Sequence, residues 1–379
     1  MDFGLSPEQE MLKRTARDFL AKQCPPTVVW EMAKDERGYP LELWQRMAEL
    51  GWMGLVLPEE YEGAGASLAD LMVLLEEMGR ACLPGPFFST VLGGMLIKEA
   101  GTAAQKAALL PKIARGESII TLSLLEPNLK YGHEGIRLAA VADGAAYRLS
   151  GTKLFVPDAH VADYVICAAR TSDARADSEG ISLFLLRMSD GQVPGVSIAP
   201  LRTMAGDKQY ELVLDNARVA AADVLGEIDG GWKPLDKVLQ VAALGKCAEA
   251  VGAIKKTLEM DVEHGKTRIQ FGVPIGSFQA VQHHCANIAT DKDIAEFLTH
   301  YAAWKLDRGD ECAREVSMAK AFVGDAYIRT VVRGHQVLGG VGLTEEHEMP
   351  LYSKRAPAVQ QLFGSTDYHR ELIAQRLGL

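Results

Sequence analysis

The sequence lacks the features that mark disulfide-stabilised, membrane-spanning and nucleic-acid-binding proteins. Its six cysteines are scattered and form no C-x-x-C pair, which fits free thiols better than a disulfide framework or a zinc site. No apolar run is long enough to span a bilayer. The formal net charge of −10 disfavours nucleic acid and anionic membranes as main partners. Met1 to Glu10 contain no basic segment followed by an apolar core, so we expect no signal peptide and a cytoplasmic protein.

Several site chemistries are missing as well. His264, His283 and His284 have no acid or cysteine at ligand spacing, so we predict no metal site. The glycine-rich stretch from Tyr61 to Ser67 lacks the Lys-Ser/Thr of a phosphate-binding loop. No serine lies in a G-x-S-x-G context, which argues against a hydrolase triad. What remains is a chain with 48% hydrophobic residues, enough for a large core and two or three domains.

The hydrophobic period changes twice along the chain. Helical stripes fill the first third, beginning at Ser6, which Gln9 can complete into a capping box. Short strand-like runs with turn residues between them fill the middle, and Asp143-Gly144 signals a hairpin. Long amphipathic segments with short links return after Gly231 and are typical of a helical bundle.

These patterns predict the following elements. Helices are expected after Ser6 and over residues 41–50, 68–78, 105–113, 234–264, 279–306, 311–338 and 357–376. Strands are expected over residues 136–141, 147–156, 164–168, 181–186 and 209–214. The predicted fold class is α+β, with an N-terminal helical domain (1–120), a middle antiparallel β barrel or sandwich (121–228) and a C-terminal four-helix bundle (229–379).

Two motifs in the last domain suggest a family. The run from Arg268 to His283 reads R-I-Q-F-G-V-P-I-G-S-F-Q-A-V-Q-H, and Gln336 to Gly342 reads Q-V-L-G-G-V-G. Both resemble signatures of the acyl-CoA dehydrogenase family, R-x-Q-F-G-x-P-I-x-x-F-Q-x-x-Q-H and Q-x-x-G-G-x-G. The Pro58-Glu59-Glu60-Tyr61 segment resembles a third family segment, and the order of helices, β module and bundle matches the family fold.

The resemblance implies FAD as cofactor and an acyl-CoA thioester as substrate. The two motifs imply an FAD-binding role, across a subunit interface, for Arg268, Gln270, Phe271, Phe278, Gln279, Gln336, Val337, Gly339 and Gly340. The chemistry of these residues is suitable, because an arginine offers a fork of donors to a pyrophosphate and glycines allow close backbone approach. Phe155 and Thr366 are further candidate FAD contacts implied by the resemblance.

The chain departs from the family at the catalytic base. Family members abstract the α-proton with a glutamate in a Y-E-G-T segment, and the matching stretch here is Phe363-Gly364-Ser365-Thr366. Gly364 occupies the place of the glutamate, or the position is deleted by one residue. The alternative family position, on the first helix of the bundle, holds no acid between Leu239 and Leu244. Asp367 and Glu249 are the nearest acids. The competing interpretations are that Asp367 caps the last helix and that Glu249 is a structural acid.

A second departure lies in the middle domain. The family's T-E-P-G-x-G-S-D loop approaches the flavin ring with small residues, and here the loop reads L-E-P-N-L-K-Y from Leu125 to Tyr131. The family's W-I-T segment becomes Phe155-Val156-Pro157. Phe155 is thus a candidate to stack on the flavin or, equally, a core residue. The flavin-ring half of the site is altered, whereas the half lent to a neighbour is intact.

This pattern resembles one subunit type of the heteromeric acyl-CoA dehydrogenases, in which a partner chain supplies the base. We therefore predict that the chain is a subunit of a hetero-oligomer. The resemblance also implies that the assembly is a tetramer, that its electron acceptor is an electron-transfer flavoprotein or a similar protein, and that it works in β-oxidation and lipid metabolism. Two alternatives stay open. One is a self-sufficient homotetramer whose displaced base is Asp367 or Glu249, and the other is a non-catalytic structural subunit.

Overall fold

The computed structural model describes residues 4–172, 178–188 and 194–379. Met1 to Phe3, part of the stretch predicted to lack a signal peptide, and residues 173–177 and 189–193 of the predicted middle domain lie outside the described residues. The chain divides into two compact units. The first unit comprises Met1–Glu31, Ser67–Leu83 and Gln240–Leu379, and the second comprises Met32–Ala66 and Pro84–Leu239. Among the described helices, none combines the length and apolar character needed to cross a membrane.

The first unit begins with helix α1 (Pro7–Gln23), which starts as the sequence predicts. The Ser6 hydroxyl accepts the Gln9 amide N–H and the Gln9 side chain accepts the Ser6 N–H, which completes the capping box. Helix α4 (Leu68–Arg80) has the same device, with Ser67 and Asp70. Arg17 donates two hydrogen bonds to the buried Glu77, at 2.9 and 2.7 Å, and thereby joins α1 to α4.

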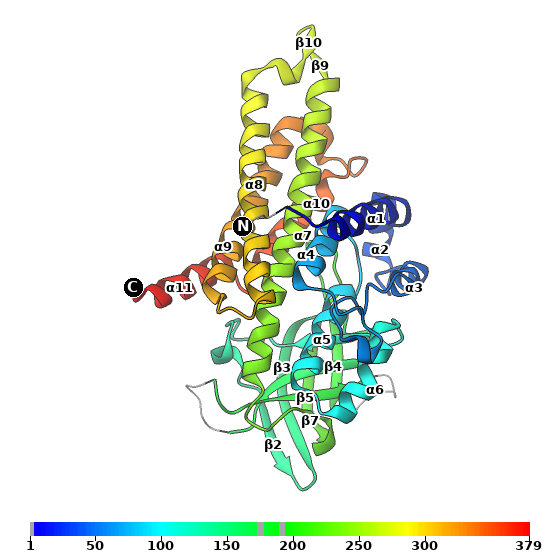
Figure 1. Cartoon of the computed structure of the whole chain (residues 1–379), viewed down its shortest axis with the longest axis vertical. Helices are drawn as coiled ribbons and strands as arrows, with labels where there is room; N and C mark the ends of the chain where they lie inside the picture. The colour runs from blue at the N-terminus through cyan, green and yellow to red at the C-terminus, as the bar shows by residue number, and fades with distance from the viewer. Residues whose placement is uncertain (1–3, 173–177, 189–193) are drawn as a thin grey trace. The chain divides into compact units, whose positions relative to one another are not determined.

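The C-terminal part of this unit is a helical bundle, and its helices are labelled in Figure 1. They are α7 (Trp232–Thr267), α8 (Gln279–Asp307), α9 (Ala313–Leu338), α10 (Met349–Gln361) and α11 (Thr366–Leu377). A two-stranded hairpin of β9 (Ile269–Gln270) and β10 (Val273–Pro274) joins the far ends of α7 and α8. Short 3-10 turns cover Ile275–Ser277 and Gly339–Leu343.

The three long helices of the bundle are confirmed, but the single helix predicted over residues 357–376 is wrong. The chain leaves helical geometry after Gln361 and starts again at Thr366, because Phe363 and Gly364 take positive φ angles of 58° and 109°. The helix before this break starts eight residues earlier than predicted, at Met349. Pro357 lies inside it rather than at its start.

Glycines allow close helix crossings in this unit. A Cβ placed on Gly79 of α4 would lie 2.0 Å from the Glu249 carbonyl oxygen of α7, and one on Gly252 of α7 would lie 1.8 Å from the Glu76 carbonyl oxygen. The backbones of α4 and α7 therefore touch at a place where no other residue fits. On α9, a Cβ at Gly334 would lie 2.9 Å from Thr257 Cγ2 of α7.

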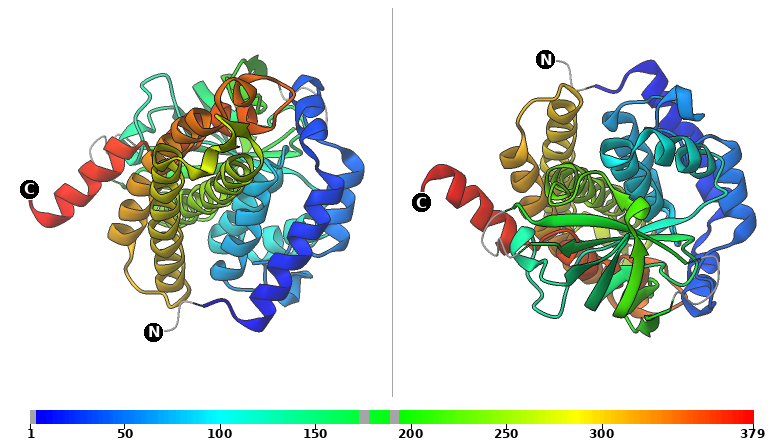
Figure 2. Two further views of the ribbon diagram at one scale, coloured as in Figure 1. Left: turned by 90° about the horizontal axis from the view of Figure 1, so that it is seen from above. Right: turned by 90° about the horizontal axis from the view of Figure 1, so that it is seen from below.

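The second unit is built on a mixed eight-stranded sheet, whose green strands lie side by side in the right-hand view of Figure 2. Its strands are β1 (Ile120–Ser123), β2 (Ala139–Asp143), β3 (Ala146–Pro157), β4 (Tyr164–Arg170), β5 (Ile181–Arg187), β6 (Val196–Leu201), β7 (Gln209–Ala220) and β8 (Val224–Leu225). The path runs β6-β7-β3-β2-β4-β5-β8, and β1 pairs with β4. The predicted hairpin is confirmed, since Asp143 pairs with Ala146.

The sheet differs from the prediction in two respects. Most neighbouring strands are antiparallel, as expected, but β1 and β2 each pair with β4 in parallel. Strands β1, β6 and β8 were not predicted. All four residues of β1 are buried, so they show no alternation of apolar and polar residues.

Helices complete the second unit. They are α3 (Leu41–Glu49), α5 (Phe87–Ala100) and α6 (Ala103–Ala114), with 3-10 turns at Glu59–Tyr61, His133–Gly135 and Ala221–Asp223. Helix α2 (Pro26–Lys34) and helix α7 each cross the division between the units. Helix α5 escaped prediction because its first eleven residues are buried all round, and a helix without a polar face has no helical stripe.

Candidate functional site

The hairpin at the end of the bundle exposes the first predicted FAD motif. Phe271 is 92% exposed with a φ of 54°, and its ring meets Phe278 edge-on at a centroid distance of 5.9 Å. Arg268 is exposed, and among the described residues no carboxylate forms an ion pair with it. Gln279 is exposed too, and the Gln270 amide reaches only its neighbour's carbonyl, at 2.8 Å. The Phe271–Phe278 ring pair and the exposed Arg268 side chain thus lie on the hydrogen-bonded β9–β10 hairpin and the turn that follows it.

The second motif ends helix α9. Val337 is 5% exposed and anchors the last turn, whereas Gln336 is exposed. Gly339 takes a φ of 62° and donates its N–H to the His335 carbonyl, which closes the helix. A Cβ at Gly339 or Gly340 would meet none of the described atoms within 4 Å. The chain therefore presents open backbone at these two glycines.

These two segments fit the adenosine and pyrophosphate half of an FAD. Exposed arginine and glutamine side chains are the donors that phosphate and ribose oxygens require. Open glycine backbone lets such a group approach without a clash. The exposed aromatic face of Phe271 suits a flat apolar surface. Arg268, Gln270, Gln279 and Gln336 would hold the group, which supplies a hydride acceptor when bound.

At the family's base position, neighbouring side chains of this chain occupy the space that a glutamate side chain would need. The Gly364 carbonyl accepts a hydrogen bond from Lys320 Nζ at 2.9 Å, and the Phe363 carbonyl lies 3.1 Å from His369 Nε2. A Cβ at Gly364 would lie 2.5 Å from His369 Nε2. Thr366, the last candidate FAD contact, is buried and donates to Asp325 at 2.9 Å.

The two acids proposed as displaced bases have ordinary surroundings. The Asp367 side chain is 94% exposed and pairs with Arg370 at 3.3 Å. It lies in the first turn of α11, and the helix cap is Ser365, so the interpretation of Asp367 as the cap is wrong. Glu249 is half-buried on α7, and Lys246 binds both of its oxygens at 2.9 and 2.8 Å.

In the second unit, Phe155 lies at an irregularity of strand β3. The register between β3 and β7 shifts between Lys153 and Val156, and Phe155 has a φ of 52°. Its side chain is 44% exposed. Such a conformation is costly for an aromatic residue and is often found at binding sites. Phe155 is therefore directed out of the core of its own unit.

The loop that replaces the family's flavin-ring segment is anchored by a buried ion pair. Lys153 is 0% exposed and donates to Glu126 Oε1 at 2.8 Å. The same oxygen accepts the backbone N–H groups of Arg137 and Leu138 at 2.9 and 3.0 Å. Glu126 Oε1 thus holds the loop to the sheet through three hydrogen bonds. Sequence reasoning noted this glutamate but had no signal for its partner.

One cluster in the first unit has the ligand types of a metal site. Glu76, Glu296 and His300 bring their polar atoms within 4.8 Å of one another. Lys255 Nζ, however, lies 2.8 Å from Glu76 and 2.6 Å from Glu296. Although burial opposes it, His300 and the neighbouring lysines hold the pKa of Glu76 well below its usual range. The lysines supply the positive charge, and the cluster is an ion-pair network.

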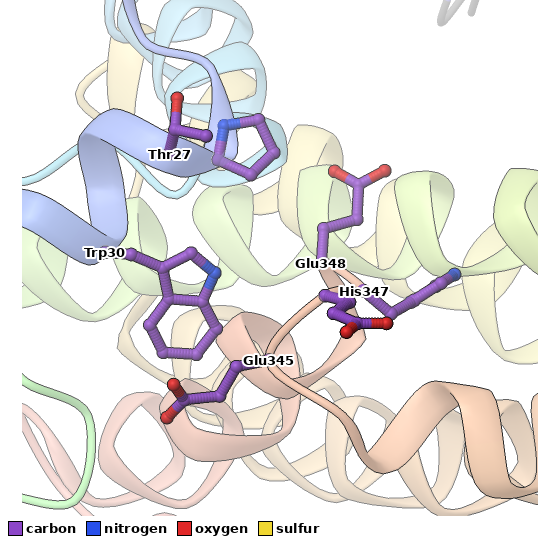
Figure 3. Close-up of a pocket in the computed structure, with 7 residues that line it drawn as sticks. Thr27, Trp30, Glu345, His347 and Glu348 are labelled. Carbon is purple, nitrogen blue, oxygen red and sulfur yellow. The ribbon is translucent and has the colours of Figure 1, made fainter.

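The first unit also has a pocket of about 310 Å³, shown in Figure 3. Trp30 of α2 lies near Glu345 on one side of the view, and His347 and Glu348 lie on the other. Lys354 already covers the Trp30 ring, with Nζ 4.8 Å from its centroid. None of the predicted site residues lines this pocket in the described part of the chain. It is separate from both FAD motifs.

Comparison with known proteins identifies the family. Models of the N-terminal, middle and C-terminal domains of acyl-CoA dehydrogenases match residues 6–117, 126–217 and 229–378. An acyl-CoA dehydrogenase of Bacillus subtilis is 30% identical over 98% of both chains. A chain in the crystal structure of the ChsE4-ChsE5 complex of Mycobacterium tuberculosis has a TM-score of 0.90 and 26% identity, with 100% of this chain and 99% of that chain covered.

A third similarity is to a chain in the structure of the electron transferring flavoprotein of Acidaminococcus fermentans. Its TM-score is 0.91 and its identity 28%, over 100% of this chain and 99% of that one. The family models together cover most of the sequence, and the predicted α+β fold with its C-terminal helical bundle is confirmed. The chain belongs to the acyl-CoA dehydrogenase family of FAD-dependent flavoproteins, which are oxidoreductases that act on CH–CH bonds.

Proposed function

We propose that this chain is one subunit of a hetero-oligomeric acyl-CoA dehydrogenase and that its partner supplies the catalytic carboxylate. In this arrangement the chain lends Arg268, Gln270, Phe271, Phe278, Gln279, Gln336, Val337, Gly339 and Gly340 to an FAD held mainly by the partner. The observation that carries the proposal is a contrast within one bundle. Apart from the buried Val337, these residues are exposed, whereas the base position at Gly364 is closed by Lys320 and His369.

The chemistry divides between the subunits. The α-proton of an acyl-CoA thioester is only weakly acidic, so its removal needs a carboxylate within hydrogen-bond reach. Neither Asp367, which points to solvent, nor Glu249, which is bound by Lys246, is poised as such a group in this chain. The exposed guanidinium of Arg268 binds phosphate oxygens, and Gly339 and Gly340 let the cofactor approach. This chain therefore binds and positions, and its partner abstracts the proton.

The proposal extends to the assembly and to its setting. One similar chain comes from a structure named as a complex of two different proteins, ChsE4 and ChsE5, and this supports a heteromer here. Another comes from a structure named for an electron transferring flavoprotein, which supports an acceptor of that kind. We further propose a tetramer that works in the cytoplasm in β-oxidation. The three-domain division at residues 120 and 228 is part of the same proposal.

The decisive experiment is the visible absorption spectrum of the purified chain, alone and co-expressed with the product of a neighbouring gene. We expect a flavin band only in the co-expressed complex. Stoichiometric FAD and dehydrogenase activity in the chain alone would overturn the heteromer. Such a result would favour the homotetramer with Asp367 or Glu249 as base, which Asp367→Asn and Glu249→Gln then separate.

Substitution of Arg268 tests the remaining hypothesis, that this chain is a non-catalytic structural subunit. Arg268→Ala removes one set of donors to the pyrophosphate, so we expect the FAD content of the assembled complex to fall at least about tenfold, as loss of a charged hydrogen bond predicts. Arg14→Ala is the matched control, since Arg14 is an exposed arginine on α1 outside both motifs. Equal FAD content in the two variants would support the purely structural role instead.

A further inference from the structure

The turn between α10 and α11 is held by an unusual set of contacts. It consists of Leu362 to Ser365, with Phe363 and Gly364 both at positive φ, 58° and 109°. The conformation is unfavourable for Phe363, whose Cβ crowds its backbone there. A turn of this kind persists only where its surroundings fix it. Two buried side chains, Lys320 and His369, do so.

Lys320 of α9 is 1% exposed, and its ammonium group has three hydrogen-bond acceptors. These are the carbonyl oxygens of Val359, Gln360 and Gly364, at 3.0, 2.8 and 2.9 Å. An ammonium group has three N–H donors, so the set is complete. Two of the carbonyls belong to the last turn of α10, where the helix dipole favours a positive charge. Lys320 therefore ends α10 and draws the Gly364 carbonyl inward.

His369 of α11 completes the arrangement from the other side. It is 4% exposed, its Nε2 lies 3.1 Å from the Phe363 carbonyl, and its Nδ1 lies 3.2 Å from the Ser317 hydroxyl. A carbonyl only accepts, so Nε2 carries the hydrogen and Nδ1 accepts from Ser317. Burial, with the charge of Lys320, lowers the pKa of His369 to about 4, and the ring is neutral at pH 7.

These contacts leave no room for a side chain at residue 364. A Cβ there would lie 2.5 Å from His369 Nε2, 2.6 Å from Tyr368 Cδ1 and 2.9 Å from His369 Cδ2. The neighbouring atoms are held by hydrogen bonds or by the helix, so they cannot withdraw cheaply. The φ of 109° adds a second obstacle, because residues other than glycine avoid it.

We infer that Lys320 and His369 are positioning residues that fix the turn in a form unable to carry a side chain at residue 364. The part of the active site that this chain forms therefore binds FAD without abstracting a proton. The inference rests on the proposed function and deepens it. The base is absent here by packing as well as by substitution. Restoring a glutamate at residue 364 alone therefore does not restore a base.

The steric part is tested by thermal unfolding of the full chain. Gly364→Ala is compared with Gly309→Ala, because Gly309 has a φ of 71° but none of the described atoms within 4 Å of its Cβ position. We expect Gly309→Ala to lower the unfolding midpoint by about 1–2 °C and Gly364→Ala by more than about 4 °C. In the double variant Gly364→Ala/His369→Ala, the loss should be smaller than the sum of the two single losses. Equal losses at the two glycines would overturn the lock.

The positioning role is tested by hydrogen exchange of the segment around residues 358–366. Lys320→Met should speed exchange there, and Lys320→Gln, which keeps two donors, should restore part of the protection. A purely apolar packing role predicts the reverse order, because methionine is the better core residue. Exchange unchanged by Lys320→Met overturns the inference.

The chemical part uses butyryl-CoA in D₂O as a probe of α-proton exchange. We expect no deuterium incorporation by the wild-type chain or by Gly364→Glu. Incorporation by Gly364→Glu at wild-type stability would overturn the lock and leave the proposed function intact. Incorporation by the wild-type chain alone would instead overturn the proposed function, since the chain would then have its own base.

Discussion

Two buried ionisable side chains of the same bundle, Lys320 and Asp261, have opposite hydrogen-bond surroundings. Lys320 is 1% exposed and donates to three carbonyl oxygens. Asp261 of α7 is 0% exposed, and neither of its oxygens has a hydrogen-bond partner among the described residues. The hydroxyls of Thr257 and Thr330 are likewise unpartnered within the described chain. One position is saturated with partners and the other has none.

The difference shows how a protein core manages charge. Burial lowers the pKa of Lys320 to about 8, a value at which most of the ammonium group is still charged at pH 7. Burial raises the pKa of Asp261 to about 7, so the carboxyl retains its proton over most of the acid range. A Cβ at Gly334 would lie 3.2 Å from Asp261 Oδ2, so only a small neutral contact fits between α7 and α9. The buried amine with three acceptors is therefore mostly ionised at pH 7, whereas the unpartnered carboxyl becomes mostly ionised only above about pH 7.

Asp261→Asn gives the largest expected effect on this comparison. Because the pKa of Asp261 is raised, its contribution to stability is complete below about pH 4 and lost as the pH rises through about 7. We expect the free energy of unfolding of the wild-type chain to fall by about 4 kcal/mol relative to Asp261→Asn between about pH 4 and pH 8. Urea unfolding at each pH measures this. Asp293→Asn, at an exposed aspartate of α8, is the control. Parallel curves for wild type and Asp261→Asn would show that Asp261 does not titrate as described.

Lys320→Met gives the next largest effect, with the opposite pH dependence. At pH 7 the loss of the ammonium group leaves buried carbonyls unpaired, which costs about 2–3 kcal/mol. Because the pKa of Lys320 is lowered, the stability it contributes rises from about pH 8 to about pH 10. The difference between wild type and variant should therefore widen in alkali by about 3 kcal/mol. Lys266→Met, at an exposed lysine, serves as control in the same denaturant titration. A difference that narrows in alkali is the outcome that contradicts this account.

Gly339→Ala tests the open glycine backbone at the end of α9, whereas the preceding substitution tests the closed turn at Gly364. The Cβ added at Gly339 meets none of the described atoms, so only the backbone conformation opposes it, with a φ of 62° and a ψ of −143°, at a cost of about 1–3 kcal/mol. Gly340→Ala, without a positive φ, should be nearly neutral for stability. Both variants should nevertheless lower the FAD content of the co-expressed complex, because a methyl group would occupy the approach of the cofactor. Full FAD content in both would remove these glycines from the site.

The smallest effect is expected from Asp367→Asn. The side chain is exposed and its pairing with Arg370 is screened by water, so the unfolding midpoint should not change measurably. Dehydrogenase activity of the assembled complex should also be unchanged. A loss of activity would identify Asp367 as a base and would require the turn beside it to open.

Much of the helical framework was predictable because its signals are local. The Ser6 and Gln9 capping box needs only four adjacent residues, and the long amphipathic helices repeat their stripe over many turns. Helix α5 and strand β1 were not predictable, because elements buried on every side have no pattern to read. The break at Phe363 was missed for another reason. It depends on Lys320, more than forty positions earlier in the chain.

The candidate site divides in the same way. Arg268 and Gly339 could be named from their motifs, since the spacing of such residues is a property of the chain alone. That Thr366 is bound to Asp325 and Glu126 to Lys153 could not, because each pair joins segments far apart in the sequence. Asp261 and Lys320 were not predicted at all. A single acid or lysine on a helix carries no sequence signal of burial.

By itself, the sequence determined which residues are available: the two motifs that predict FAD binding, the caps of the helices and a glycine in the stretch that resembles the family's base segment. These depend on neighbours along the chain or on residue identity. Only the tertiary structure decided that a side chain at residue 364 meets His369 and Tyr368, that burial lowers the pKa of Lys320 and that burial raises the pKa of Asp261. The physical reason is that steric exclusion and desolvation arise from atoms that folding brings together from distant segments.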